Sequence, residues 1–147
     1  MKNSPYAAYF VNSFGIKRDE LLGWQALADD HPEAAVTALR RAADQQDKLG
    51  QDEVDIPARE MLGDVLLLEH QPAEALAEYR VALKLSPNRL NGLLSAGNAA
   101  EEAGLTDQAR AFYGAAARQT SSGANSARPE LAHAVQVAAS AVAAKTD

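Results

Sequence analysis

A group of four small and aromatic residues recurs in this chain at an interval of 34 residues. The two copies are Gly63, Ala75, Tyr79 and Ala82, followed by Gly97, Ala109, Tyr113 and Ala116. A repeat of this length is typical of helix-turn-helix units, which bury their apolar faces only by stacking on neighbouring units. The interval therefore predicts an all-α solenoid, an architecture that usually serves to bind other proteins.

A third copy of the pattern lies upstream and is displaced by an insertion. Its members stand 40 residues before their counterparts in the middle copy: Leu22-Gly23, Ala35, Leu39 and Ala42. Since every member shares a spacing of 40 rather than 34, six extra residues must lie between Ala42 and Leu62. The polar stretch 49–55 is the natural place for them, because insertions in surface loops change stability little. We therefore expect three repeats, over residues 16–55, 56–89 and 90–123, with the inserted loop at 49–55.

The small residues of the pattern have a packing role. A glycine inside a helix lowers its stability by about 1 kcal/mol relative to alanine, and it is accepted where a second helix must approach the backbone closely. We expect such an approach at three mid-helix glycines: Gly23, Gly63 and Gly97. The alanine that begins each second helix supplies a matching small face, and a larger residue one turn later fills the remaining gap. The three pairs are Ala35 with Leu39, Ala75 with Tyr79, and Ala109 with Tyr113.

This pattern resembles the tetratricopeptide repeat over about residues 16–123, and the resemblance implies a right-handed α-solenoid. In the middle unit the key residues stand where the family has them: Gly63, Ala75, Tyr79, Ala82 and Pro87. The first unit departs from the family by its insertion, and the third has Ser121 where a proline is usual. The aromatic residue that the family usually has near the start of each first helix is replaced by Asp19, Arg59 and Leu93.

The stretches 57–64 and 86–89 also resemble uncharacterised bacterial repeat proteins. In those proteins the similar stretch is the C-terminal part of a longer chain. The sequence is therefore expected to be a fragment or a short relative of such proteins.

Two terminal segments flank the repeats. In residues 1–15, Ser4-Pro5 is a helix-start signal, and aromatic residues follow at helical spacing: Tyr6, Tyr9, Phe10 and Phe14. This N-terminal helix either covers the open end of the first repeat or was the second helix of a preceding repeat. In residues 124–147 a polar linker precedes a helix that begins at Pro129 and runs to about Lys145. Its apolar stripe is typical of a C-terminal capping helix and consists of Leu131, Val135, Ala138 and Val142.

Composition and charge argue against several classes of function. The net charge of −6 argues against nonspecific binding of nucleic acid or of an acidic membrane, since both require a basic surface. The chain has no cysteine, which excludes disulfides and thiol chemistry. No apolar run approaches the ~18 residues of a membrane span. The N-terminus lacks the basic and then apolar pattern of a signal peptide, so we expect a cytoplasmic location.

The family resemblance implies that binding residues lie on a concave groove lined by the first helix of each repeat. The residues in register there are Glu20, Trp24, Leu27, Glu60, Asp64, Leu67, Asn91, Leu94, Asn98 and Glu101. Asn91 and Asn98 stand two helical turns apart, and an asparagine amide can both donate to and accept from a peptide backbone. The carboxylates favour a basic or N-terminal-amine partner over an acidic one. We therefore expect a non-catalytic module that binds a peptide or protein segment.

Two interpretations stay open for several of these residues. The carboxylates and Asn98 also fit an ordinary solvated helix face. Trp24 is the only tryptophan, and it is either an anchor in the groove or a core residue packed under the N-terminal helix against Tyr9 or Phe10. Relatives that clamp the C-terminal carboxylate of a chaperone use basic residues, whereas this chain has Glu20 and Glu60 there. Such a tail would be repelled.

The sequence does not favour an enzyme. Its histidines are isolated, without a second ligand at metal-binding spacing: His31, His70 and His133. We also find no glycine-rich phosphate loop or nucleophile elbow, and we expect neither a metal nor a cofactor. The remaining alternative is a structural role, in which the chain forms a homodimer through its terminal helices. The alanines of the C-terminal helix would permit close approach of a second copy but suit an intramolecular cap equally well: Ala132, Ala138, Ala139 and Ala143.

Overall fold

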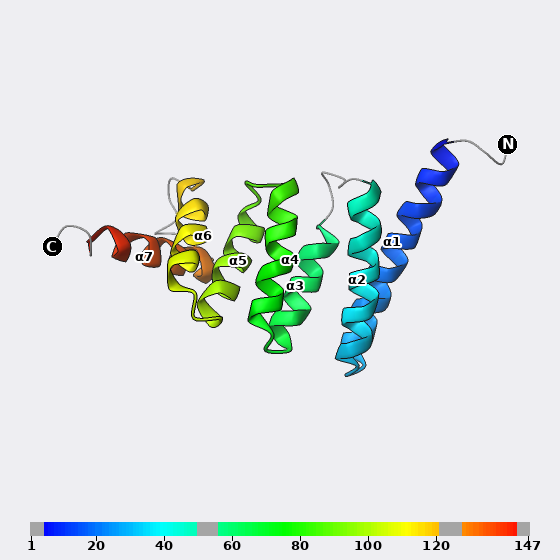
Figure 1. The fold of residues 1–147 in the computed structure, drawn as a ribbon, viewed down its shortest axis with the longest axis horizontal. Coiled ribbons are helices and arrows are strands. Elements are labelled where there is room, and N and C mark those ends of the chain that lie inside the picture. The colour runs from blue at the N-terminus through cyan, green and yellow to red at the C-terminus, as the bar shows by residue number, and fades with distance from the viewer. Residues whose placement is uncertain (1–4, 50–55, 121–127, 144–147) are drawn as a thin grey trace. The chain divides into compact units, whose positions relative to one another are not determined.

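The computed structural model describes the backbone of residues 5–49, 56–120 and 128–143 and the side chains of residues 9–49, 56–120 and 128–140. Every regular element in these ranges is an α-helix, which confirms the predicted all-α class (Figure 1). The helices are α1 (Pro5–Ala28), α2 (Pro32–Leu49), α3 (Ala58–Leu68), α4 (Pro72–Leu85), α5 (Leu90–Glu102), α6 (Thr106–Arg118) and α7 (Pro129–Ala143). The inserted loop expected at 49–55 lies, apart from Leu49, outside the described residues.

The chain divides into two compact units, residues 1–70 and 71–147. The first unit contains α1, α2 and α3, and the second contains α4, α5, α6 and α7. The boundary falls in the turn after α3, inside the second of the three expected repeats. Each unit has its own buried residues, such as Leu39 and Leu62 in the first and Tyr79 and Tyr113 in the second.

Proline begins four of the described helices. The fixed φ angle of proline suits the first helical turn, where its missing N–H is not needed. The residues are Pro5, Pro32, Pro72 and Pro129. Three of these helices also carry a carboxylate in the first turn, which interacts favourably with the positive end of the helix dipole: Glu33, Glu74 and Glu130. These local signals explain why each helix starts where it does.

Three turns share one backbone conformation. The left-handed residues are Asp30, His70 and Gly104, with φ values of 60°, 56° and 73°. The N–H of each donates to the carbonyl three residues earlier, at 3.1, 3.0 and 2.9 Å respectively, so each preceding helix ends there. The three positions are 40 and 34 residues apart, as are the members of the sequence pattern. The sequence period is therefore also a period of backbone conformation.

α1 differs from the sequence expectation. The sequence predicts a separate N-terminal helix within residues 1–15, but the chain forms one helix from Pro5 to Ala28. Gly15 lowers helix stability without ending the helix. Ser13, a residue type that often caps helices, instead donates to the carbonyl of Tyr9 at 3.0 Å, inside the helix. The residues expected to form a separate N-terminal helix therefore belong to the same helix as Gly23 and Trp24.

The packing of the first unit depends on small residues. A Cβ atom on Gly23 of α1 would lie 2.6 Å from Cγ of Leu39 on α2, so only glycine permits this approach. Further along, α1, α2 and α3 meet in a buried cluster of Ile16, Ala42, Ala43 and Ala58.

A polar contact inside the first unit fixes the start of α3. The Oε1 atom of Gln46, on α2, accepts a hydrogen bond from the backbone N–H of Ala58 at 2.8 Å in a buried setting. The N-cap residue of α3 is Pro57, which makes no side-chain cap hydrogen bond. Gln46 therefore satisfies a backbone donor that the helix itself leaves without an acceptor.

In the second unit α5 packs between α4 and α6, and α7 packs on α6 and contacts α5. A Cβ atom on Gly97 of α5 would collide with the ring of Tyr113 on α6, which repeats the relationship of Gly23 and Leu39. On α7, Leu131 and Ala134 are buried. Two further residues of the apolar stripe expected on this helix, Val135 and Ala138, are half-buried. The side chain of Val142 lies outside the described residues.

Candidate binding surface

The exposed face of α5 carries three polar side chains along one side of the helix. Asn91, Asn98 and Glu102 are all exposed and lie along one side of the helix. Nδ2 of Asn98 donates to Oε1 of Glu102 at 3.0 Å, and Nη2 of Arg128 donates to Oδ1 of Asn91 at 3.1 Å. These bonds orient two amides that stand about 10 Å apart along the helix axis.

Glu101, the neighbouring carboxylate, joins side chains from α6 and α7. Its Oε2 accepts a hydrogen bond from the hydroxyl of Tyr113 at 2.9 Å and lies 2.8 Å from Nε2 of His133. The rings of Tyr113 and His133 meet edge to face with centroids 5.3 Å apart. The hydrogen bond with His133 is the largest cause that holds the pKa of Glu101 below its ordinary value. Burial and the Glu101 carboxylate raise the pKa of Tyr113. This cluster ties α7 to α5 and α6.

The predicted groove residues differ in exposure. Those of the first unit that reach the surface are Trp24, which is exposed, and Leu27, Asp64 and Leu67, which are half-buried. Those of the second unit that reach it are Asn91, Asn98 and Glu101. The remaining three are buried: Glu20, Glu60 and Leu94. Glu20 accepts from Nζ of Lys17 at 3.1 Å. The groups most available to a partner are therefore Trp24 in the first unit and the α5 amides and Glu101 in the second.

The continuity of α1 bears on the core interpretation of Trp24. Tyr9 and Phe10 are on the same helix as Trp24, roughly 20 Å away along the axis, so they do not pack against it. The core interpretation is therefore wrong in this form, and 38% of the surface of Trp24 is exposed.

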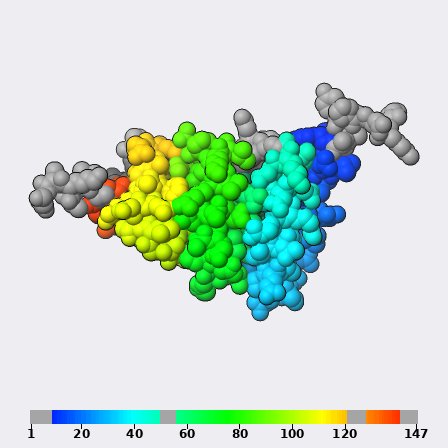
Figure 2. Space-filling view, in the orientation of Figure 1, coloured from blue at the N-terminus to red at the C-terminus, as the bar shows by residue number. Residues whose placement is uncertain are grey.

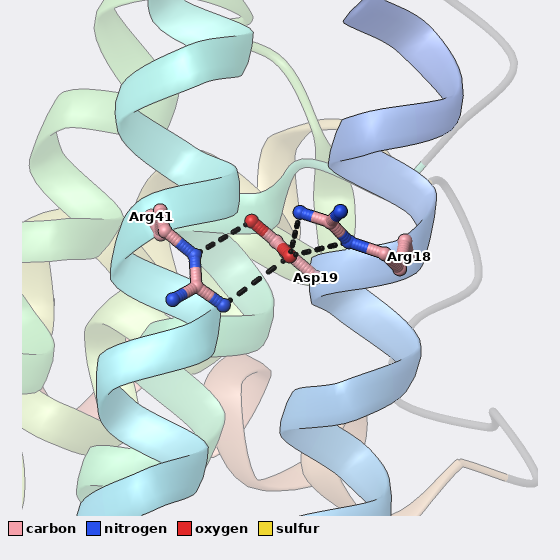
Figure 3. A network of polar contacts seen from close by, with 3 residues as sticks. All are labelled: Arg18, Asp19 and Arg41. Carbon is pink, nitrogen blue, oxygen red and sulfur yellow. Dashed lines mark hydrogen bonds and ion pairs between the residues drawn. The ribbon is translucent and has the colours of Figure 1, made fainter.

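A buried carboxylate in the first unit binds two arginines (Figure 3). The side chain of Asp19 is fully buried, and it accepts from Nε and Nη2 of Arg41 at 2.8 and 3.2 Å. Nε and Nη2 of Arg18 also donate to it, at 3.1 and 2.9 Å. The hydrogen bonds from Arg41 are the largest cause that holds the pKa of Asp19 below its ordinary value.

Arg59, the second position where an aromatic residue is expected, also forms ion pairs with α2. Its Nη2 lies 2.7 Å from Oδ1 of Asp44 and 2.8 Å from Oδ2 of Asp47. Asp19 and Arg59, at two positions where the resemblance leads us to expect an aromatic side chain, therefore each carry a charge that pairs with α2.

Two depressions lie at turns between helices. One of about 430 Å³ is lined by residues 104–108 and 110, and one of about 370 Å³ by residues 30–34. Neither is lined by any of the predicted groove residues.

Among the residues that the structure describes, no cluster of histidine and acidic side chains is arranged to hold a metal ion. No described helix combines the length and the apolar character that crossing a bilayer requires. None of the protein-family models compared with this chain matches it, and none of the curated proteins does.

Proposed function

We propose that this chain is a non-catalytic binding module of the tetratricopeptide type, a right-handed α-solenoid of three repeats that holds a peptide or protein segment. Its partner is a basic or amine-bearing segment rather than an acidic one, and it meets that partner in the cytoplasm. The exposed amides and carboxylates of α5 form the main contact in the second unit. Trp24, Asp64 and Leu67 form a contact of their own in the first.

Two repeating features support the repeat architecture. The left-handed residues Asp30, His70 and Gly104 follow the same spacings of 40 and 34 as the sequence pattern. In each unit a glycine receives the large side chain of the neighbouring helix, Leu39 on Gly23 and Tyr113 on Gly97. Such close approaches at a fixed period are what stacked helix-turn-helix units require.

The observation that carries the proposal is the pair of exposed amides on α5. Asparagine is a poor residue inside a helix, because its side chain competes for backbone hydrogen bonds. Nevertheless, Asn98 stands at an exposed position inside α5, held by Glu102. Asn91 stands in the first turn of the same helix, held by Arg128. Two oriented amides about 10 Å apart match the spacing of residues i and i+3 in an extended peptide, at roughly 3.3 Å per residue.

The charge beside these amides favours a basic partner. Glu101 and Glu102 are both exposed, next to Asn98. Glu101 is hydrogen-bonded to His133, and Glu102 accepts from Asn98. A lysine or arginine side chain, or an N-terminal ammonium, would displace or join these weak surface contacts and form charge-assisted bonds.

The test is a peptide array probed with the full chain, followed by titration of the retained peptides. We expect retention of basic peptides and rejection of acidic ones of the same length. Asn98→Ala should raise the dissociation constant about tenfold, which corresponds to the loss of one good hydrogen bond. The matched control is Asn88→Ala, at an exposed asparagine in the turn before α5. Equal binding by both variants, or a preference for acidic peptides, would contradict the α5 assignment.

The first-unit contact needs a separate variant. Glu60 is buried, so a charge reversal there would disturb folding. Asp64→Lys alone changes a half-buried position and leaves Glu60 intact. If it weakens binding of basic peptides as Asn98→Ala does, both units contact the partner. If only Asn98→Ala weakens it, the contact is confined to the second unit.

A further inference from the structure

α1 exposes a stripe of large apolar side chains, called the α1 stripe below. Its members and their exposed fractions are Phe10 57%, Phe14 72%, Leu21 71% and Trp24 38%. The buried residues of the same helix include Ile16, Asp19 and Gly23. At 100° per residue these lie on roughly the opposite side of α1. Neither α2 nor α3 therefore covers the stripe.

The α1 stripe follows heptad spacing. When Lys17 and Ala28 are included, the spacing between successive members alternates between four and three residues. The full series is Phe10, Phe14, Lys17, Leu21, Trp24 and Ala28. Apolar residues that recur every 3.5 residues on average form the seam between two paired helices. A single polar residue in such a seam restricts the register and the number of helices. The spacing thus indicates a helix as the covering element.

The area of this face matches a protein interface. Given 150–250 Å² for a fully exposed aromatic side chain, the α1 stripe exposes on the order of 500 Å² of apolar surface. Tyr9, Val11 and Leu22 flank it and are exposed as well. Two copies that cover the stripe together would bury on the order of 1,000 Å², the lower limit for a specific interface.

The N-terminal part of α1 is also accessible to a second molecule. α1 has 24 residues and α2 has 18, so α1 extends past the end of its neighbour. In Figure 2 this part of α1, in blue, projects beyond the surface formed by α2, in cyan. A helix that approaches Phe10 and Phe14 therefore does not meet α2 first.

We propose that a second copy of this chain covers the α1 stripe from Phe10 to Leu21, with the two α1 helices antiparallel about a two-fold axis and Trp24 at the edge of the pairing. A parallel pair in register would set Lys17 against Lys17 of the second copy, where like charges repel. In an antiparallel pair centred near Gly15, Leu21 lies opposite Phe10 of the second copy. Lys17 then lies opposite Phe14 of the second copy, where an ammonium group meets an aromatic ring. This orientation also sets opposite ends of the helix dipoles side by side.

Sedimentation of the full chain tests the association. The wild type should form a dimer at micromolar concentrations. Phe14→Glu/Leu21→Glu should be monomeric, with a dissociation constant raised at least about 100-fold, because it places charge in the centre of the interface. The control is Leu85→Glu, which changes an exposed leucine on α4 and should leave the dimer intact. Trp24 stays unchanged in every variant, because it also belongs to the proposed peptide contact.

Spin labels test the orientation. The chain has no cysteine, so Gln25→Cys provides a single labelling site beside the stripe. In the antiparallel pair the two labels should be about 30 Å apart, and in a parallel pair about 10 Å, given 1.5 Å of rise per residue. The shorter distance would overturn the antiparallel arrangement.

Two outcomes would overturn the association itself. One is a wild type that stays monomeric throughout the micromolar range. The other is a double variant that dimerises as well as Leu85→Glu does. Circular dichroism checks that the double variant remains helical, and Leu21→Gln, a single uncharged change, repeats the measurement should it unfold. This proposal is independent of the peptide contact on α5, which Asn98→Ala tests separately.

Discussion

Asp19 on α1 and Arg41 on α2 form a two-point ion pair, with the two carboxylate oxygens accepting from Nε and Nη2 of the guanidinium at 2.8 and 3.2 Å. The carboxylate is fully buried, whereas about half of the arginine side chain is exposed. Part of the interface between α1 and α2 therefore depends on the charge of one group rather than on apolar packing alone.

Removing that charge should destabilise the first unit. In Asp19→Asn the guanidinium groups lose a charged acceptor, and we expect the free energy of unfolding to fall by about 1–2 kcal/mol. This is the lower part of the range for hydrogen bonds to charged groups, because both arginines remain in contact with water. Urea unfolding followed by circular dichroism measures it. Asp29→Asn, at an exposed position just after α1, should change stability by less than about 0.5 kcal/mol. Equal effects of the two substitutions would contradict a special role for Asp19.

The lowered pKa values of Asp19 and Glu101 predict a loss of stability in acid. The pKa of Asp19 is lowered from 3.8 and that of Glu101 from 4.5, so the folded chain binds fewer protons than the unfolded chain in this range. Their stabilisation is fully present above the unfolded pKa values and is lost as the pH falls through the lowered folded values. The contribution of these two groups to the urea concentration at the unfolding midpoint should therefore be constant between about pH 7 and 5.5. The midpoint concentration should decrease when the pH is lowered below about 4. The gap between wild type and Asp19→Asn should narrow over the same acid range. A gap that is independent of pH would argue against ionised Asp19 as its source.

Gly97 and Gly114 should respond to alanine in opposite directions, although both are helical residues of the second unit. A Cβ on Gly97 meets the ring of Tyr113, so Gly97→Ala should lower stability by about 1–3 kcal/mol through overpacking. At Gly114 the nearest atom is the flexible Nη1 of Arg118 at 3.5 Å. Gly114→Ala should therefore gain most of the helix propensity of alanine, up to about 1 kcal/mol. Thermal unfolding of the two variants compares them directly, and a gain for Gly97→Ala would show that the tyrosine moves aside without loss.

Substitutions at the left-handed turn residues should also change stability in opposite directions. His70 has a φ of 56°, a conformation that costs a residue with a side chain about 1–2 kcal/mol, whereas glycine adopts it freely. His70→Gly should raise the melting temperature, and Gly104→Ala should lower it. Asp30→Gly should give a smaller gain than His70→Gly, because aspartate tolerates this conformation better. A loss of stability in His70→Gly would mean that the imidazole makes contacts worth more than the relief of strain.

The glycine contacts were predictable from the sequence because they follow from spacing alone. A mid-helix glycine and a large residue 16 positions later identify both Gly23 with Leu39 and Gly97 with Tyr113. The length of α1 was not predictable in the same way. Proline marks where it starts, but the repeat pattern suggests a boundary near residue 16 where no residue ends a helix.

The polar contacts were missed for a different reason. Asp19 and Arg41 are 22 residues apart, and Glu101 and His133 are 32 apart, so their meeting depends on how helices pack and not on any local motif. One signal was available: Asp19 and Arg59 stand where an aromatic residue is expected, and an ionised group at a packed position needs a partner. The burial of Glu20 and Glu60 likewise depends on neighbouring helices. Their assignment to the groove used only the register of the repeats and took no account of those helices.

The hydrogen bond from the Ala58 N–H to Gln46 bears on the order of folding. α3 has 11 residues, fewer than an isolated helix needs to persist in water, and its first turn takes its acceptor from α2. A fully bonded start of α3 therefore depends on α2 being in place. Hydrogen exchange at the Ala58 amide should be at least as fast as the opening of α2 around Gln46 allows, because each such opening removes its acceptor.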